Sequence, residues 1–434
     1  MKTYLILAAL VLVLVPAAYA EDIIRKGELL TLERAVEIGL KMHPSVRAGK
    51  GSVDVNRARR GQAESAYYPQ VDANAGYTRF QPSTVSTGTT TVGIRRLQES
   101  NSFEQYNTSV TARQTLFDFG KTRTNVNIQK LNIEASQADL ANTEEQVILN
   151  VKQAYYNLLR AKRNRVVAEE TIKQFEQHLG QAKAFYEVGT KPKFDVTKAE
   201  VDLSTARLSQ ISAENAVRIA YVSLNNAMGA PDAPEYVIED KLSFEKYQMT
   251  VDEAMEKAYA NRPELKSILA KKKASEEAIA LARKGYYPVL TGNADWTWAG
   301  ERFANGDGWS AGVGLSIPIF SGFLTRNQVS EAKANLVVLT ANEESLRQTV
   351  LLEVQQSLLN LREAEERIST AELTVRQAQE NYEIANGRYA AGVGNPIEVT
   401  DAEVALANAK TSYIQALYDF RVARASLEKA MGSR

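Results

Sequence analysis

The strongest constraint on the fold is an internal repeat. The segments AYYPQVDANAGYT at residues 66–78 and GYYPVLTGNADWT at residues 285–297 both carry Tyr-Tyr-Pro followed by a short alternating run. His43-Pro44 and Arg262-Pro263 match at the same offset of 219 residues. Because long self-similarity is typical of a repeated supersecondary unit, the sequence predicts two copies of one fold.

A second set of matches has a shorter offset of 203 residues. TLFDFGKTR at 115–123 aligns with PIFSGFLTR at 318–326, and NNAMG at 225–229 aligns with EKAMG at 428–432. The 16 residues that separate the two offsets fall in the Ser/Thr/Gly-rich segment between Arg79 and Ser102. We predict that this segment is a loop that varies between the two copies.

These matches define the expected domain organisation. We predict a first repeat at 21–229 and a second repeat at 250–432, joined by a linker at 230–249 in which Pro231 and Pro234 mark the break. Each repeat is expected to hold a helix, a β-hairpin and a long helical hairpin. The β-hairpins are placed at 69–118 and 288–320, and the helical hairpins at 121–229 and 325–431.

The first 20 residues have the pattern of a secretory signal peptide. They combine a Lys, an apolar run and Ala18-Tyr19-Ala20, so we expect a signal peptide at 1–20 and an exported protein. The alternative is an uncleaved anchor, which the short apolar run disfavours. Beyond it there is no run of about 18 apolar residues, which argues against a protein that crosses the membrane with helices.

The composition excludes several functional classes. The chain has no Cys, which excludes disulfides, thiolate metal sites and lipidation on an N-terminal Cys. Lys plus Arg and Asp plus Glu both total 52, so no nucleic-acid partner is expected. His43 and His178 lie far apart, and no nucleophile elbow or Walker sequence occurs. We therefore expect no catalysis, no cofactor and no metal.

An alternating pattern follows each Tyr-Tyr-Pro and resumes after the variable loop. Apolar and polar or small residues alternate at 71–78, 106–116, 290–298 and 309–319. These runs predict four strands of about ten residues, which is enough to cross a bilayer when the strands are tilted. A half-buried soluble sheet would show the same alternation, so this pattern alone leaves both possibilities open.

Aromatic residues lie at both ends of the predicted strands. At the end where strands meet helices they are Tyr67, Tyr68, Phe117, Tyr286, Tyr287 and Phe320, and at the other end they include Trp296, Trp298 and Trp309. Two aromatic belts that bound an apolar band are typical of an outer-membrane β-barrel, so we interpret these residues as membrane-interface aromatics. The aromatic placement favours a barrel over a soluble sheet.

Four strands cannot close a barrel, because closure requires about eight or more. Open strand edges are not tolerated in lipid, so the barrel must be shared between chains. Two chains would give eight strands and a filled interior, whereas three would give twelve strands and an open lumen. A pore function favours three chains.

The helical segments carry heptad repeats. Between residues 121 and 188 apolar residues recur at intervals of seven, and the matching stretch of the second repeat has the same pattern. Heptads with many Ala residues are typical of closely packed coiled coils. The predicted fold class is therefore mixed α/β but mostly α: a duplicated helical coiled-coil tunnel with a four-strand sector of a trimeric twelve-stranded barrel.

The chain resembles the TolC family of outer-membrane efflux proteins over nearly its whole mature length. The resemblance rests on the duplicated unit, the repeated YYP, LFDFGKTR with PIFSGFLTR, and the segment RYAAGVGNPIEVTDAE. It implies a homotrimer in outer-membrane lipid with its helices in the periplasm. It also implies a periplasmic adaptor (membrane fusion protein) and an inner-membrane pump of RND or ABC type, serving efflux or type I secretion.

The resemblance also implies functional residues. Glu398 and Asp401 would line the pore entrance, and Tyr389 would help to hold it closed. The adaptor-docking tips would lie at the turns of Gly189, Thr190, Gly392 and Val393. A structural alternative exists for Glu398, because Asn395, Pro396 and Glu398 fit the N-cap, first and third positions of a helix.

Two rival functions remain open at the level of sequence. The first is a periplasmic structural or adaptor coiled-coil protein whose strands form a soluble sheet. The second is a general diffusion porin, which the length of the helices disfavours. The leading expectation is an outer-membrane exit duct that works passively with an energised partner.

Overall fold

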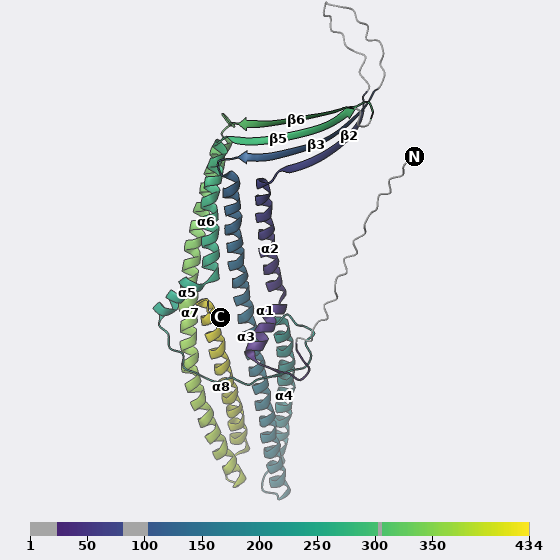
Figure 1. Ribbon diagram of the computed structural model, residues 1–434. Helices are drawn as coiled ribbons and strands as arrows, with labels where there is room; N and C mark the ends of the chain where they lie inside the picture. Colours follow the sequence, from purple (N-terminus) through teal and green to yellow (C-terminus); the bar gives the residue numbers. More distant parts are fainter. Residues whose placement is uncertain (1–23, 81–102, 303–305, 434) are drawn as a thin grey trace, which may run out of the picture. The chain divides into compact units, whose positions relative to one another are not determined.

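The computed structural model describes residues 24–80, 103–302 and 306–433 (Figure 1). The predicted signal peptide at 1–20 and residues 81–102 of the predicted loop lie outside these residues. The chain is mostly helical, as the sequence predicts.

The chain divides into two compact units. The unit that we call the helical unit comprises Met1–His43, Asn150–Glu245 and Ala364–Val422. The second, the sheet unit, comprises Pro44–Leu149, Lys246–Glu363 and Ala423–Arg434. Each unit combines segments from both repeats. The boundaries of the compact units therefore differ from the boundaries of the sequence repeats.

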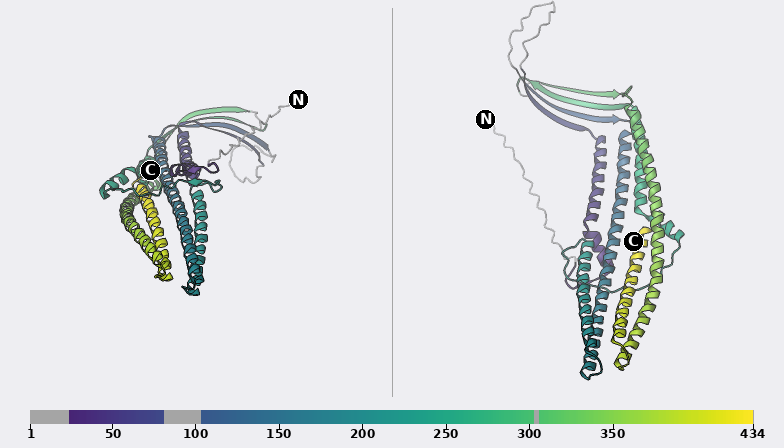
Figure 2. Two further views of the ribbon diagram at one scale, coloured as in Figure 1. Left: turned by 90° about the horizontal axis from the view of Figure 1, so that it is seen from below. Right: turned by 180° about the vertical axis from the view of Figure 1, so that it is seen from behind.

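Two helical hairpins make up most of the helical unit (Figures 1 and 2). The first consists of the C-terminal part of α3 (Lys121–Glu187) and α4 (Lys193–Ala227). The second consists of the C-terminal part of α7 (Leu324–Ala390) and most of α8 (Pro396–Ala430). The heptad prediction is reflected in the packing, because small and apolar side chains fill the space between the paired helices. Those between α3 and α4 are Phe175, Ala182, Val196, Ala199, Leu203 and Ala206.

A two-stranded parallel ribbon in the helical unit was not predicted. Strand β1 (Leu29–Leu30) precedes α1 (Leu32–Met42) and pairs with β4 (Val237–Ile238). The buried hydroxyl of Tyr155 on α3 lies 3.0 Å from the carbonyl oxygens of both Leu30 and Glu239. Strand β4 lies in the segment that joins the repeats, so part of the predicted linker is ordered and bonded to α3.

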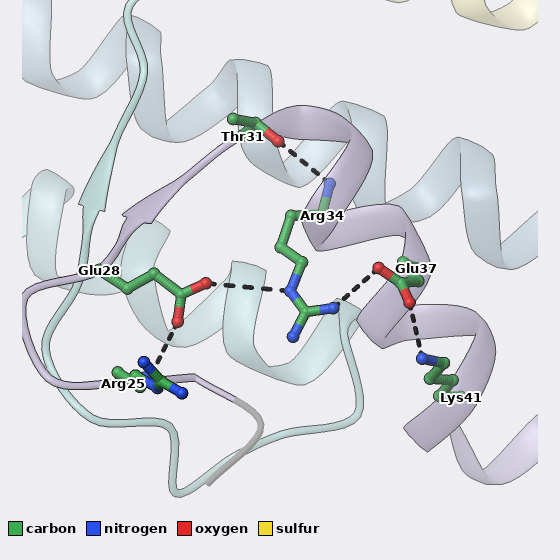
Figure 3. A network of polar contacts seen from close by, with 6 residues as sticks. All are labelled: Arg25, Glu28, Thr31, Arg34, Glu37 and Lys41. Carbon is green, nitrogen blue, oxygen red and sulfur yellow. Dashed lines mark hydrogen bonds and ion pairs between the residues drawn. The ribbon is translucent and has the colours of Figure 1, made fainter.

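Figure 3 shows a ladder of polar contacts at the beginning of α1. The side chain of Thr31 caps the helix by accepting a hydrogen bond from Arg34 N at 3.2 Å. The guanidinium of Arg34 contacts Glu28 at 3.9 Å and Glu37 at 2.8 Å, and Lys41 Nζ reaches Glu37 at 2.6 Å. Hydrogen bonds from Lys41 and Arg34 lower the pKa of Glu37. These exposed ion pairs support the helix locally and add little stability.

The sheet unit contains a four-stranded antiparallel sheet in the order β2-β3-β5-β6 (Figure 1). Its strands are β2 (Gln70–Phe80), β3 (Phe103–Phe117), β5 (Val289–Gly300) and β6 (Asp307–Ser316). The register shifts between Thr115 and Phe117, where β3 pairs with β5. Strand β6 ends earlier than the alternating pattern through Ile319, because Pro318 has no N–H to continue the ladder.

Short and long helices lead into the strands of the sheet unit. Helix α2 (Pro44–Glu64) and the 3₁₀ turn η1 (Ser65–Tyr67) precede β2. Helices α5 (Val251–Asn261) and α6 (Pro263–Arg283) and the turn η2 (Lys284–Tyr286) precede β5. Two ion pairs hold α6 to its neighbours: Lys271 to Asp139 of α3 at 3.0 Å, and Lys272 to Glu343 of α7 at 2.9 Å.

Across the described ranges, no helix combines the length and the apolar character that a membrane-spanning helix requires.

Candidate functional site

The strand register separates the residues of the sheet onto two chemically different faces. Residues paired directly across antiparallel strands lie on the same face. One row across the sheet is Ala73, Val110, Trp296 and Trp309. The adjacent row is Asp72, Thr111, Asp295 and Ser310. One face is therefore mainly apolar and the other mainly polar.

Hydrogen bonds link side chains on the polar face, both between strands and within one strand. Thr111 Oγ1 of β3 donates to Asp295 Oδ1 of β5 at 2.7 Å, and Thr297 Oγ1 donates to Asp295 Oδ2 at 2.6 Å. On the apolar face Gln114 is an exception, but its amide donates to the Tyr67 carbonyl at the helix end of the sheet. The band between the two ends is thus formed mainly by Ala, Val, Leu and Trp side chains, and it also includes Thr108.

The aromatic residues predicted at the strand–helix junctions are exposed and partly clustered. The Phe119 ring lies 4.7 Å from Phe117 and is stacked 5.4 Å from Tyr287, measured between ring centroids. Phe320 similarly contacts Phe323 at 5.6 Å. The predicted junction residues that expose a large part of their surface are Tyr67, Tyr68, Phe117, Tyr286, Tyr287 and Phe320. Sequence analysis had not singled out Phe323.

Phe119 and Phe323 have positive φ angles of 54° and 65°. Bulky side chains rarely adopt this backbone conformation, and such strain is concentrated at functional or tightly constrained positions. Both residues lie at the return from strand to helix, but one position apart in the aligned repeats, because Phe119 aligns with Gly322 and Phe323 aligns with Gly120. The strained turn therefore holds an aromatic side chain at each junction.

At the other end of the sheet the three Trp residues lie on β5 and β6. Trp296 and Trp298 have ring centroids 5.8 Å apart, and Trp296 pairs across the strands with Trp309. Tyr77 and Tyr106, which are also paired, lie 5.1 Å apart. Aromatic groups therefore occupy both ends of the sheet, and their membrane-interface role stays a prediction.

The two predicted tips have the same backbone structure. Gly189 and Gly392 have φ angles of 75° and 78°, which favour Gly at these positions. Thr190 N donates to the Phe185 carbonyl at 3.0 Å, and Val393 N donates to the Arg388 carbonyl at 3.2 Å. The turns are exposed, with Val393 at 74%.

The structure places Glu398 and Asp401 on the exposed surface of the first turns of α8. Asn395 Oδ1 accepts a hydrogen bond from Ile397 N at 2.9 Å, which confirms the predicted N-cap. The Glu398 carboxylate lies 3.8 Å from the guanidinium of Arg388 on α7, and both side chains are largely exposed. The two carboxylates are thus available to solvent in the protomer.

Tyr389 lies apart from these carboxylates, in the core. Its exposed fraction is 0%, and its ring contacts His178 at 4.9 Å and Phe185 at 5.5 Å between centroids. Lys191 Nζ donates to the Gly394 carbonyl at 3.2 Å and lies 5.8 Å from the Tyr389 ring centre. Tyr389 therefore joins the two helical hairpins through packing.

Sequence reasoning missed a buried carboxyl group beside this core. Glu403 of α8 is 1% exposed and lies near Asp202 of α4. Burial, followed by the charge of Asp202, raises the pKa of Glu403 to about 8. The local sequence gave no signal, because the equivalent Glu200 in the first repeat is exposed.

Comparison with known proteins identifies the family. A model of the outer membrane efflux protein family matches residues 36–230 and 254–433. The chain is similar to outer membrane protein TolC of Escherichia coli (strain K12), with 23% identity over 408 residues that cover 90% of this chain and 80% of TolC. It is also similar to outer membrane efflux protein BepC of Brucella suis biovar 1, with 24% identity over 431 residues covering 95% and 89% of the two chains.

The fold is shared with a solved transmembrane channel. CusC superposes with a TM-score of 0.80 at 18% sequence identity, covering 93% of this chain and 92% of CusC. Because the family model matches most of both repeats, this chain belongs to the outer membrane efflux protein family.

Proposed function

We infer that this protein is the outer-membrane exit duct of an efflux system, with its sheet in the outer membrane and its long helices in the periplasm. The observation that carries this function is the sheet with one apolar and one polar face. An apolar face suits lipid, and a polar face suits a water-filled lumen.

The sheet order supports a homotrimer. Strands β2 and β6 are the two edges of the four-stranded sheet. Such edges are not tolerated in lipid, so strands from other copies must pair with them. Three copies supply twelve strands and leave an open lumen, whereas two supply eight and leave an interior filled by side chains.

The duct works with partners that supply energy. Proteins of the TolC type act with a periplasmic adaptor and an inner-membrane pump. For this chain we propose a membrane fusion protein as the adaptor and a pump of RND or ABC type, with type I secretion included as a use. The exposed turns at Gly189, Thr190, Gly392 and Val393 are the proposed docking tips.

Two neighbouring substitutions test the membrane assignment. Ala294 lies on the apolar face and Asn293 on the polar face of β5. Ala294→Lys should prevent assembly in the outer membrane, because a cation facing lipid costs about 2–4 kcal/mol. Asn293→Lys should assemble as a trimer and reduce cation conductance in planar bilayers. Equal tolerance of both changes, or release of wild-type protein by osmotic shock alone, would favour the periplasmic rival.

The entrance assignment is a separate proposal. Glu398 and Asp401 of three chains would form a ring of six carboxylates whose combined potential attracts cations. Replacing them with Gln and Asn should weaken cation selectivity and block by multivalent cations in single-channel recordings. Glu187→Gln combined with Glu200→Gln, which removes the same number of exposed carboxylate charges from the first repeat, is the control. Unchanged selectivity in an assembled double variant would show that these residues do not line the entrance.

The docking proposal predicts a selective loss of export. Thr190→Asp and Val393→Asp add a charge to exposed turns without altering the glycines that set their backbone. Export should fall sharply while the trimer and its conductance in bilayers remain intact. Normal export by both variants would leave the turns with a structural role only.

A further inference from the structure

A cluster of ionisable side chains lies between the two helical hairpins of the helical unit. Lys198 Nζ of α4 lies 2.7 Å from both carboxylate oxygens of Asp202. Thr400 Oγ1 of α8 donates to Asp202 Oδ2 at 3.0 Å. Asp202 therefore has a cation on its own helix and a hydrogen bond from the opposite hairpin.

Glu403 lies one turn beyond Thr400 on the same side of α8. It is fully buried, and its Oε2 atom has no hydrogen-bond partner among the residues that the structure describes. The Asp202 charge is near enough to disfavour a second negative charge at this position. A buried carboxylate with an unmet oxygen and a like-charged neighbour is costly as an anion.

The ligand that fits this site is a proton. In the described part of the chain, no group of three His, Cys, Asp or Glu side chains is arranged to hold a metal ion. Lys198 already occupies both oxygens of Asp202. Binding of one positive charge at Glu403 removes the repulsion between the Glu403 and Asp202 carboxylates. A proton provides this charge and needs no further ligands.

We propose that Glu403 is a proton-binding site that joins the two helical hairpins. The bound proton keeps the carboxyl neutral beside Asp202. Its release loosens the contact between α4 and α8 at Asp202, Thr400 and Glu403, which we call the seam. The link from the seam to the conducting state of a duct rests on the proposed function. The proton site itself does not.

The direction of the pH dependence follows from the burial of Glu403. Burial, and then the charge of Asp202, raises the pKa of Glu403 from 4.5 to about 8. A loosened seam exposes the group and returns its pKa toward 4.5, so the closed seam binds the proton more tightly. The stabilisation is fully present below about pH 4.5 and is lost as the pH rises through about 8.

Other titratable groups face the cluster from each packed helix. Helix α7 contributes Tyr382, whose pKa is raised by burial and by Glu403, and Tyr389, whose pKa is raised by burial and by Asp195 of α4. Helix α3 contributes His178, whose pKa burial lowers from 6.5. Protonation of His178 therefore loosens the seam on the acidic side. Glu403 is the group that titrates between about pH 7 and 9.

Infrared spectroscopy of the assembled wild-type protein tests the proton directly. Ordinary Asp and Glu side chains are ionised by pH 7. A protonated carboxyl band that disappears between pH 7 and pH 9 should therefore report Glu403. The band should be absent in Glu403→Gln and present in Glu200→Gln, its repeat-equivalent control. Absence of the band in wild-type protein, or its persistence in Glu403→Gln, overturns the proposal.

A second variant keeps the test decisive if Glu403→Gln fails to assemble. Asp202→Asn removes the charge that repels ionised Glu403. The band should then disappear at a lower pH than in wild-type protein. An unchanged or higher titration pH contradicts the assigned geometry.

Hydrogen exchange measures the seam itself. After correction for intrinsic exchange, the opening constant for amides of residues 396–406 should rise about fivefold between pH 7 and pH 8 and level off above about pH 9. Glu403→Gln should abolish this rise, and Glu200→Gln should keep it. An equal rise in Glu403→Gln overturns the proposal.

Bilayer recordings separate this inference from the proposed function. If the protein conducts and Glu403→Gln removes its pH-dependent conductance between pH 7 and 9, the seam controls the duct. If wild-type protein does not conduct but shows the exchange and infrared changes, the duct function fails and the proton site stands. If wild-type and Glu403→Gln protein conduct with the same pH dependence, this site does not control the duct.

Discussion

The tips of the two helical hairpins have nearly the same local sequence but opposite surroundings. Both α4 and α8 carry Val-Thr-x-Ala-Glu in their first turns, at 196–200 and 399–403. In the first repeat Tyr186 is 47% exposed, whereas its equivalent Tyr389 is 0% exposed. Glu200 is likewise exposed and Glu403 buried.

The difference arises from what each hairpin packs against. In α8 the face that carries Thr400 and Glu403 turns toward α4, and Thr400 bonds to Asp202. The equivalent Thr197 instead bonds within its own helix, to the Lys193 carbonyl at 3.3 Å. Duplication thus preserved the helices and turns, while the contact between the hairpins gave one copy a buried polar cluster.

The largest difference in stability between the two repeats should come from truncating the equivalent tyrosines, Tyr186 and Tyr389. Tyr389→Ala removes a buried ring from between the hairpins and should cost roughly 3–5 kcal/mol, because the cavity cannot collapse fully. Tyr186→Ala should change stability by about 0.5 kcal/mol or less in the protomer. Thermal unfolding and hydrogen exchange of residues 385–402 measure both. Equal losses would show that Tyr186 is buried to the same degree in the assembled protein.

A smaller difference is expected for the paired threonines. Thr400→Val keeps the shape but removes the donor to the Asp202 carboxylate, which should cost about 2 kcal/mol. Thr197→Val removes only a hydrogen bond to its own helix and should be nearly neutral. Denaturant unfolding of the two variants gives the comparison. A neutral Thr400→Val would mean that the seam does not depend on this bond.

The smallest difference concerns the helix caps. Asn395 caps α8 through its side chain, whereas Pro192 at the start of α4 makes no side-chain cap bond within the described structure. Asn395→Ala should destabilise the first turn of α8 by about 1 kcal/mol, and Pro192→Ala should have a smaller effect on α4. Exchange rates of the first-turn amides measure both. Greater fraying of α4 would reverse the comparison.

Local chemistry made much of the fold predictable. Alternation indicated the strands, heptads indicated the paired helices, and Asn395-Pro396 marked the beginning of α8, as the structure shows. Pro318 shows the limit of alternation, because Ile317 and Ile319 continue the pattern after the strand has ended.

Features that depend on distant contacts could not be predicted. Leu29–Leu30 and Val237–Ile238 are too short to show a period, and their pairing is set by contacts far along the chain. The burial of Glu403 could not be read from Val-Thr-x-Ala-Glu, because the same pattern is exposed in α4. The family resemblance predicted that Tyr389 helps to hold the entrance closed, but only the packing shows that its side chain lies in the core.

The open edges of the sheet at β2 and β6 have a genetic consequence. If three protomers are needed to close the barrel, a single defective protomer prevents the whole trimer from forming a closed barrel. In a cell that makes equal amounts of wild-type and Ala294→Lys protein, random mixing leaves only about one trimer in eight wholly wild type. A variant that still associates but cannot enter lipid should therefore be dominant over the normal gene, whereas a variant that fails to associate should be recessive.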